Sequence, residues 1–231
     1  MYGKLDAAKL LRALASSEKQ EPGGFLPKGP TVTVSRDDES GGEEIAQHLA
    51  RHLGVHCLDK ELLEAIVQEA HVSQDLLEQL DEHVHGMLDD AMRTLMTGQH
   101  FGRENYRSCL VRVVLGISAH GGVIVGRAAN LILGARRAFR VRVVGSVDTC
   151  AQRLAMRQRI PLVEALRHVQ SVNAERAQFV QLHFQKDIND ATTYDLSINT
   201  DRISFADAVD VVLCMMQKAG LTGTKRKAAA V

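Results

Sequence analysis

Residues 35–44, with the sequence SRDDESGGEE, place backbone N–H donors and an arginine beside five acidic side chains. The Ser-Gly-Gly at 40–42 leaves peptide nitrogens available to an anion. A short β-branched run at 31–34 precedes the loop, and an amphipathic stretch at 43–53 follows it. A strand, a Ser/Gly turn and a helix N-terminus form a common phosphate-binding unit, because the N–H groups and the helix dipole both attract an anion. We therefore predict a phosphate site in this loop.

The loop matches only part of the usual nucleotide phosphate loop, G-x-x-x-x-G-K-[ST]. In that pattern the lysine neutralises the β- and γ-phosphates, and the Ser/Thr hydroxyl holds Mg²⁺. Aligned on the helix start, Gly41 takes a glycine place, Gly42 stands where the lysine would be, and Glu44 lies near the Ser/Thr place. The loop therefore keeps flexible N–H donors but has no lysine.

The carboxylates beside these donors are Asp37, Asp38, Glu39, Glu43 and Glu44. Two like charges about 4 Å apart repel by roughly 4 kcal/mol at an effective dielectric constant near 20, so a bound triphosphate needs compensation. Arg36, arginines later in the chain or a bridging Mg²⁺ can supply it. Three interpretations stay open: acids that merely favour a helix N-terminus, a loop with degraded ATP binding, or a working site that uses Arg36.

Short apolar runs alternate with helical patterns along the rest of the chain. We predict strands at 31–34, 55–58, 123–125, 139–145 and 194–199. We predict helices at 4–16, 43–53, 60–70, 74–97, 106–119, 128–133, 148–159, 161–186 and 204–218. Short, continuously apolar strands separated by helices imply an α/β domain whose parallel sheet is covered on both faces.

The composition is that of an ordinary globular chain. The 231 residues include 28 Lys+Arg and 28 Asp+Glu, so no net charge indicates a nucleic-acid or membrane partner. No apolar run approaches the roughly 18 residues of a membrane span, and the first 20 residues lack the apolar core of a signal peptide. The four cysteines are isolated, which favours free thiols and a cytoplasmic location.

Pro, Gly and charge patterns divide the chain into three parts. A Pro/Gly-rich linker at 21–30 ends an N-terminal extension, which we place at residues 1–29. The main domain then occupies residues 30–218. A basic tail at 219–231 is expected to be disordered.

Four stretches, taken in order, resemble the cytidylate kinase-like family, a branch of the P-loop nucleoside monophosphate kinases, over about residues 31–214. They are VTVSRDDESGGEEIAQHLARHLGVHCLDKELLEAI, GGVIVGRAANLIL, RVRVVGSVDTCAQRLAMRQRIPLVEAL and YDLSINTDRISFADAVDVVL. The resemblance implies a three-layer P-loop NTPase-like fold. It has a five-stranded parallel sheet of order 2-3-1-4-5, a helical acceptor-binding insertion at 60–120, and ligands at the C-terminal ends of the strands. The family usually has a glycine where Glu39 stands.

The resemblance assigns an acceptor-binding role to Asp59 and Arg127, which each follow a predicted strand. In such kinases the Gly-Arg turn meets the phosphate of the acceptor nucleotide, and the planar fork of arginine suits a phosphate. An acid usually follows the Gly-Arg, whereas Ala128 follows it here. The alternatives are that Asp59 caps the helix at 60–70 and that Arg127 is an ordinary helix-start residue.

The resemblance also makes Arg153, Arg157 and Arg176 lid arginines, which neutralise charge on a transferring phosphoryl group. Arg153 and Arg157 lie four apart and share a helix face. Arg176 follows Asn173, where many kinases of this type carry an aspartate. The alternative for Arg153 and Arg157 is a solvated helix face.

The function implied is transfer of the γ-phosphoryl group of ATP, with Mg²⁺, to a small nucleotide such as CMP. The nucleotide-binding residues expected are Ser35, Arg36, Ser40, Gly41, Gly42 and Glu44. The alternative is a catalytically degraded nucleotide-binding or sensing module on the same fold, because the lysine is absent. The ten histidines form no converging metal set, so we predict no protein-held metal site. Leu and Met residues on the helix at 74–97 are numerous enough to pair two copies as a homodimer.

Overall fold

The computed structural model describes residues 6–15, 29–95 and 106–221. The last two residues of the predicted helix at 74–97 lie outside the described residues, as do most of the predicted linker and most of the predicted tail. The bounds of the strands are β1 Thr31–Arg36, β2 Cys57–Leu58, β3 Gly122–Val125, β4 Phe139–Val144 and β5 Leu196–Asn199.

The five strands form one parallel sheet of order β2-β3-β1-β4-β5, which confirms the predicted sheet and its order. The central strand β1 pairs with β3 on one side and with β4 on the other, so that Val34 lies beside both Val125 and Val141. This order places the C-terminal ends of β1 and β3 next to each other. The loop after each strand therefore opens at the same edge of the sheet.

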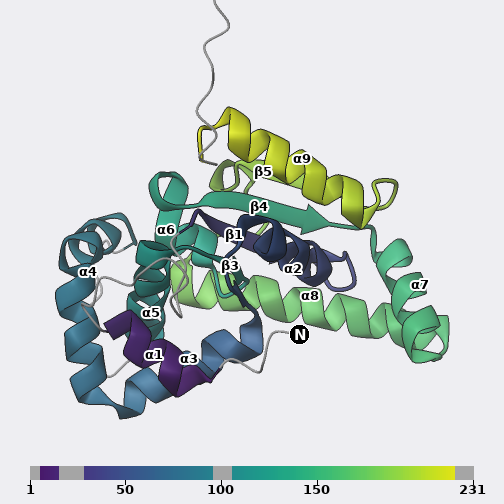
Figure 1. Ribbon diagram of the computed structural model, residues 1–231. Coiled ribbons are helices and arrows are strands. Elements are labelled where there is room, and N and C mark those ends of the chain that lie inside the picture. Colours follow the sequence, from purple (N-terminus) through teal and green to yellow (C-terminus); the bar gives the residue numbers. More distant parts are fainter. Residues whose placement is uncertain (1–5, 16–28, 96–105, 222–231) are drawn as a thin grey trace, which may run out of the picture.

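Helices cover both faces of this sheet (Figure 1). Their bounds are α1 Ala7–Ala15, α2 Gly42–Leu53, α3 Lys60–Val72, α4 Gln74–Leu95, α5 Tyr106–His120, α6 Ala129–Arg137, α7 Val147–Gln158, α8 Leu162–Phe184 and α9 Phe205–Lys218, with a 3-10 turn at Ala191–Thr193. Alternate residues of β3 face opposite cores: Val123 and Val125 pack with α2 and α9, whereas Ile124 packs with α3, α5 and α6. The strands therefore read as continuously apolar because both faces are buried.

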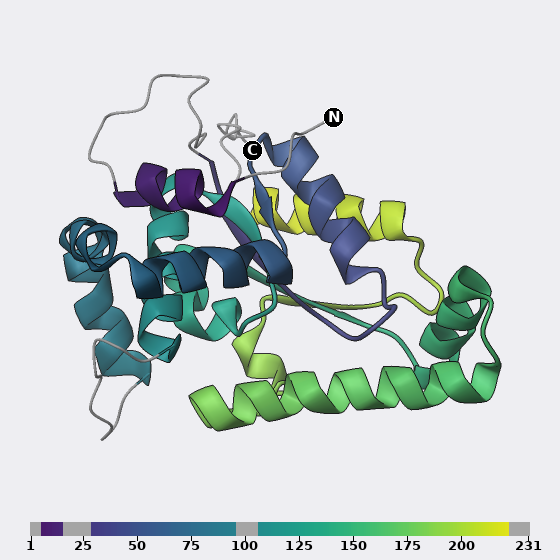
Figure 2. The ribbon, with the colours of Figure 1, turned by 90° about the horizontal axis from the view of Figure 1, so that it is seen from below.

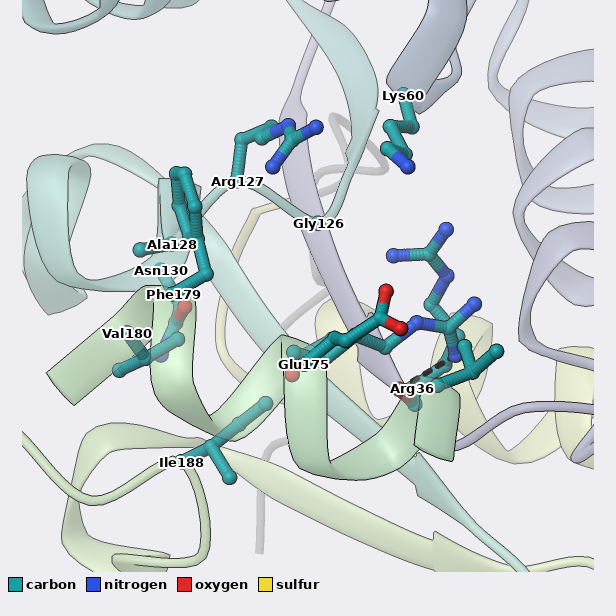
Figure 3. Close-up of a pocket in the computed structure, with 13 residues that line it drawn as sticks. Arg36, Lys60, Gly126, Arg127, Ala128, Asn130, Glu175, Phe179, Val180 and Ile188 are labelled. Atoms are coloured by element: carbon teal, nitrogen blue, oxygen red, sulfur yellow. Dashed lines mark hydrogen bonds between the residues drawn. The ribbon is translucent and has the colours of Figure 1, made fainter. Parts of the chain in front are cut away.

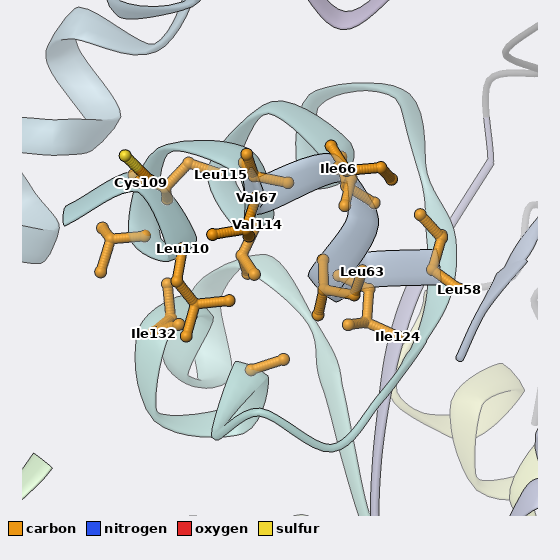
Figure 4. Packing of buried hydrophobic residues seen from close by; sticks show 14 of the residues in the cluster. Leu58, Leu63, Ile66, Val67, Cys109, Leu110, Val114, Leu115, Ile124 and Ile132 are labelled. Atoms are coloured by element: carbon orange, nitrogen blue, oxygen red, sulfur yellow. The ribbon is translucent and has the colours of Figure 1, made fainter. Parts of the chain in front are cut away.

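The larger core lies between the sheet and the helices α1, α3, α4, α5 and α6 (Figure 4). Helix α1 belongs to it: Leu10 and Leu11 are fully buried, and the helix contacts α3, α4 and α5. The sequence pattern placed this helix in an extension, yet its apolar face is part of the domain core. Burial of those leucines explains why a nine-residue helix, too short to be stable alone, holds its place.

Helices α7 and α8 form a hairpin that extends beyond the sheet (Figures 1 and 2). The hairpin has a small core of its own, built from Cys150, Ala151, Leu154, Ala165 and Val169. Helix α8 is 23 residues long, and its far end returns to the larger core through Val180 and Phe184. We call residues 147–184 the lid hairpin. None of the helices in the described ranges is both long and apolar enough to cross a membrane.

Candidate active site

The loop between β1 and α2 has the backbone that a phosphate loop requires. Gly41 is the residue before the helix and adopts a left-handed conformation, with φ of 81°. No side chain caps the helix, and the N–H groups of residues 41–44 find no hydrogen-bond acceptor among the described residues. The first helical bond is that of the Ile45 N–H to the Gly41 carbonyl, at 2.9 Å. The predicted peptide donors are therefore free to bind an anion.

Ser40 plays a different part from the one the sequence suggests. Its side chain is fully buried, and its hydroxyl lies 2.8 Å from the Asp37 carbonyl and 3.2 Å from the Val143 carbonyl. The Ser40 carbonyl accepts a hydrogen bond from the Thr200 hydroxyl at 2.8 Å. The Ser40 hydroxyl thus fixes the loop to the sheet, and its contacts give no support for a role in binding a nucleotide.

Arg36 fills the space in which the side chain of a phosphate-loop lysine would begin. A Cβ atom at Gly42 would lie 2.4 Å from the Arg36 Cβ atom, closer than real side chains approach. Arg36 is only 7% exposed, and its Nε donates to Glu43 at 2.6 Å. Its guanidinium lies against Gly126, where a Cβ atom would be 2.5 Å from the Arg36 Nη1. A side chain at position 42 would therefore collide with Arg36, which explains the glycine there.

Four of the five loop carboxylates pair with arginines. The pairs are Asp37 with Arg142 at 2.6 Å, Asp38 with Arg176 at 3.3 Å, Glu39 with Arg157, and Glu43 with Arg36 at 2.6 Å. The fifth, Glu44, is exposed and is in no ion pair with any residue of the described ranges. The negative charge of the loop is thus compensated within the protein, from β1, β4 and both helices of the lid hairpin.

Asp38 is the most perturbed of these carboxyl groups. Burial raises the pKa of Asp38 above its ordinary value near 3.8, and Arg176 opposes that rise. One of its oxygens is buried without a hydrogen bond and lies 3.6 Å from the Nε2 of His168. Its backbone N–H donates to the side-chain oxygen of Asn173 at 2.8 Å. Asn173, which replaces the aspartate common in such kinases, accordingly binds the loop.

The predicted lid arginines all reach the loop. Arg153 donates to the Glu39 carbonyl at 3.2 Å and to the Thr200 carbonyl at 2.5 Å, and its guanidinium carbon lies 5.1 Å from the centre of the Phe205 ring. Arg176 donates to the Arg36 carbonyl at 3.2 Å as well as to Asp38. The alternative of a purely solvated face is therefore wrong for Arg153, whereas Arg157 is 59% exposed and still pairs with Glu39.

A cavity of about 290 Å³ opens at the C-terminal ends of β1 and β3, beside this loop (Figure 3). Four cationic side chains line it, of which the three arginines also pair with carboxylates outside the lining. In Figure 3, Lys60 and Arg36 point toward the same space from different elements. Among the described residues that line it, Glu175 is the only carboxylate. The polar lining residues are Ser35, Arg36, Lys60, Arg127, Asn130, Glu175 and Arg176.

Arg127 lines the cavity and lies in a turn of left-handed residues. Arg127 and Ala128 are both left-handed, with φ of 51° and 55°, and they follow a left-handed Gly126. The Arg127 side chain pairs with Glu64, and its guanidinium carbon lies 4.6 Å from the centre of the Phe179 ring. Burial and the neighbouring Arg36 lower the pKa of Arg127. Helix α6 begins only at Ala129, so Arg127 is not an ordinary helix-start residue.

Asp59 caps α3, as the alternative interpretation held. Its carboxylate accepts the Leu62 N–H at 2.8 Å, and the residue is exposed and does not line the cavity. The next residue, Lys60, lines it instead. Ser35 also lines the cavity, and its hydroxyl lies 3.3 Å from the Tyr194 hydroxyl.

Sequence reasoning missed Lys60, Glu175 and Phe179 as lining residues. A signal for two of them exists, because Val172, Glu175, Arg176 and Phe179 have the i, i+3, i+4, i+7 spacing of one helix face. The described residues contain no group of three or more His, Cys, Asp or Glu side chains that could hold a metal ion. All four cysteines are free thiols, and burial raises the pKa of Cys57 to about 12, which makes it a poor nucleophile.

Comparison with known proteins agrees with this geometry. The model of the cytidylate kinase-like family matches residues 31–202. The chain belongs to the cytidylate kinase-like family. A cytidylate kinase from Methanothrix thermoacetophila is 25% identical over 190 residues, which cover 80% of this chain and 97% of the relative. The crystal structure of an uncharacterized protein from Eubacterium ventriosum superposes with a TM-score of 0.65 at 22% identity, covering 83% of this chain and 99% of the other. The predicted family is thus confirmed, and so is the predicted five-stranded parallel sheet of order 2-3-1-4-5.

Proposed function

We propose that the protein transfers the γ-phosphoryl group of ATP to a nucleoside monophosphate such as CMP. The observation that carries this proposal is the cationic cavity beside the free N–H groups of the β1–α2 loop. Four cationic side chains reach it from β1, α3, the β3–α6 turn and α8. An acceptor phosphate needs several converging cations, and the family membership supplies the reaction class.

In this proposal the residues act by position and charge. The N–H groups of Gly41 and Gly42 hold the donor phosphates, with Arg36 in place of the lysine. Arg127 and Lys60 hold the phosphate of the acceptor, and Arg176 lies between the loop and the cavity. Phosphoryl transfer requires little covalent chemistry from side chains. The protein has to hold the attacking and leaving oxygens in line and to neutralise the charge on the loosely bonded phosphoryl group.

Magnesium would be held mainly by the phosphates of the nucleotide. Mg²⁺ keeps several waters and takes one or two carboxylates beside the phosphate oxygens. Ser40 is committed to backbone carbonyls, and the carboxylates from Asp37 to Glu43 are paired with arginines. Glu44 is exposed and has no ion-pair partner among the described residues, so it is the carboxylate best placed to contribute.

A direct assay tests the proposal. Purified protein is incubated with radiolabelled ATP and Mg²⁺ and a panel of nucleoside monophosphates, and label transfer is followed. We expect transfer to at least one monophosphate and a loss of about tenfold or more in its apparent affinity in the Arg127→Met variant, since a charge-assisted hydrogen bond is worth about 1.5–3 kcal/mol. Arg136→Met, an exposed change on the following helix, is the matched control. Transfer to no monophosphate would contradict the proposed reaction.

The second candidate is a nucleotide-binding protein without turnover. The absence of the lysine and the pairing of Arg157 and Arg176 with loop carboxylates favour it. Thermal unfolding with ATP, CMP and inorganic phosphate at low salt separates it from an empty domain, because a ligand stabilises the folded state in proportion to ln(1+[L]/Kd). A shift in the midpoint without label transfer indicates this second function.

A further inference from the structure

We infer that Glu39 is a positioning residue that substitutes for a nucleotide phosphate: its carboxylate holds the lid hairpin closed over the β1–α2 loop, and an incoming polyphosphate replaces it. The inference rests on the proposed function only for the identity of that ligand. It concerns the one loop residue that combines a carboxylate, a strained backbone and contacts to the lid.

The contact between Glu39 and Arg157 has the form of an arginine–phosphate contact. Arg157 donates from Nε to one carboxylate oxygen at 3.2 Å and from Nη2 to the other. Two parallel bonds from one guanidinium are the arrangement that arginine makes with carboxylates and phosphates alike. The carboxylate of Glu39 thus occupies the binding fork of a predicted lid arginine.

Further bonds join the same short segment of loop to the lid. Arg153 donates to the Glu39 carbonyl at 3.2 Å, Arg176 donates to Asp38 at 3.3 Å, and Asn173 accepts the Asp38 N–H at 2.8 Å. Two successive loop residues therefore bind side chains from both α7 and α8. All of these contacts are polar, and they come from hairpin residues that precede Val180 and Phe184, which pack in the larger core. Arg153 also donates to Thr200, so the loop is not the hairpin's only polar contact with the body.

The backbone of Glu39 provides an independent observation. Its φ of 56° lies in the left-handed region, which glycine adopts freely and other residues adopt at a cost of order 1 kcal/mol. A glutamate persists in such a conformation when its surroundings over-determine it. The bidentate contact to Arg157 and the bond from Arg153 to the carbonyl are those surroundings.

Electrostatics gives the direction of the effect on ligand binding. A polyphosphate on the loop would need Arg157 and would be repelled by the Glu39 carboxylate. Replacing Glu39 by glutamine removes the repulsion and the competing anion, so affinity for pyrophosphate or ATP should rise. A residue that served only to hold the loop in shape would lower affinity when it is replaced.

The experiment measures the position of the lid and the affinity separately. Nitroxide labels on Cys214, an exposed native thiol of α9, and on a cysteine introduced at the exposed Glu164 report the distance between the lid and the body by pulsed electron spin resonance. The labels are placed in wild type and in the Glu39→Gln, Glu39→Gly and Glu44→Gln variants. Glu44→Gln removes the same charge from the same loop, and in the described residues the Glu44 carboxylate forms no ion pair or hydrogen bond with a lid arginine and has only a minor coulombic effect on Arg157. Because the ligand is metal-free, the proposed Mg²⁺ contact of Glu44 plays no part, and the variant is the matched control for loss of charge.

We expect a narrow distance distribution in ligand-free wild type and in Glu44→Gln, and a broader one with longer distances in both Glu39 variants. Metal-free pyrophosphate should restore the narrow distribution in the Glu39 variants and bind Glu39→Gln about tenfold more tightly than wild type. Equal distributions in all variants, or equal gains in affinity for Glu39→Gln and Glu44→Gln, would overturn the inference. If the lid opens in the Glu39 variants but pyrophosphate binds Glu39→Gln no more tightly than wild type, the inference is overturned, because no ligand replaces the carboxylate. Label transfer from ATP in the direct assay decides the proposed function separately.

Discussion

Replacement of Arg36 by methionine tests the residue that takes the place of the phosphate-loop lysine. Arg36 is 7% exposed, lines the cavity and donates to Glu43 at 2.6 Å. Methionine keeps most of the volume over Gly42 but removes the charge and all the donors. The variant therefore separates the electrostatic role of Arg36 from its role in filling space.

The two expected magnitudes differ enough to be told apart. The Glu43 side chain is 43% exposed and keeps a second ion-pair contact, with Arg176 at 3.7 Å, when Arg36 is replaced. The free energy of unfolding should therefore fall by only about 1 kcal/mol. A charge-assisted hydrogen bond to phosphate is worth about 1.5–3 kcal/mol, so ATP should bind about ten- to a hundredfold more weakly. Urea unfolding measures the first quantity, and isothermal titration calorimetry with ATP measures the second.

Two further variants decide the cause of any loss. Arg51→Met, an exposed change on α2, controls for the loss of one positive charge and should bind ATP as wild type does. If ATP affinity falls only because the Glu43 charge is no longer balanced by Arg36, Glu43→Gln should restore it in the Arg36→Met background. Binding of ATP by folded Arg36→Met within twofold of wild type would refute the role given to Arg36.

Three other predictions concern stability and are measured by urea unfolding. Gly41→Ala should lower the free energy of unfolding by more than 2 kcal/mol, because a left-handed alanine costs about 1–2 kcal/mol and its Cβ would lie 2.3 Å from the Phe205 ring. Gly54 is also left-handed, but a Cβ atom there would meet nothing within 4 Å, so Gly54→Ala should cost only the backbone penalty of about 1–2 kcal/mol. Leu11→Ala should cost about 2–5 kcal/mol if α1 belongs to the core, and under 1 kcal/mol would contradict that placement. Asp38→Asn should gain stability relative to wild type as pH rises from below 3.8, the ordinary pKa of the group, through its raised folded value. Burial raises the pKa of Asp38 in the folded state, so its contribution is greatest below its ordinary pKa and is lost as pH rises through the folded value; an unchanged difference would exclude this.

Local pattern was enough to place most of the elements, because the signals that determine them lie within a few residues. The predicted helix at 43–53 is Gly42–Leu53, and the predicted strand at 139–145 is Phe139–Val144. The predicted strand at 55–58 is reduced to Cys57–Leu58, since only two residues pair with β3. The predicted stub at 128–133 begins at Ala129, and after the non-helical Gly134 helical backbone resumes as far as Arg137.

The charges of the site could not be read in the same way. Arg142 lies inside a strand and looks like an interruption of an apolar run, yet it pairs with Asp37, which is 105 residues away along the chain. Likewise, Arg157 and Arg176 reach the loop from helices more than a hundred residues downstream. Ion pairs between residues so far apart depend on how β4 and the lid hairpin are placed beside the loop, which a local sequence pattern does not predict.

The β1–α2 loop lacks the usual lysine but keeps a positive charge, because Arg36 supplies one from the preceding strand. In the usual phosphate loop a cation projects from the helix, and small residues beneath it leave the space free. Here the cation comes from the strand, so Arg36 and a lysine at position 42 would exclude each other, and Gly42 follows from Arg36. The acids around the loop are compensated separately: Glu43 pairs with Arg36, whereas Asp37, Asp38 and Glu39 pair with Arg142, Arg176 and Arg157. The missing lysine therefore follows from Arg36, whereas the charge of the acids is balanced by arginines from β1, β4 and the lid hairpin. Restoring the lysine alone would place it in occupied space.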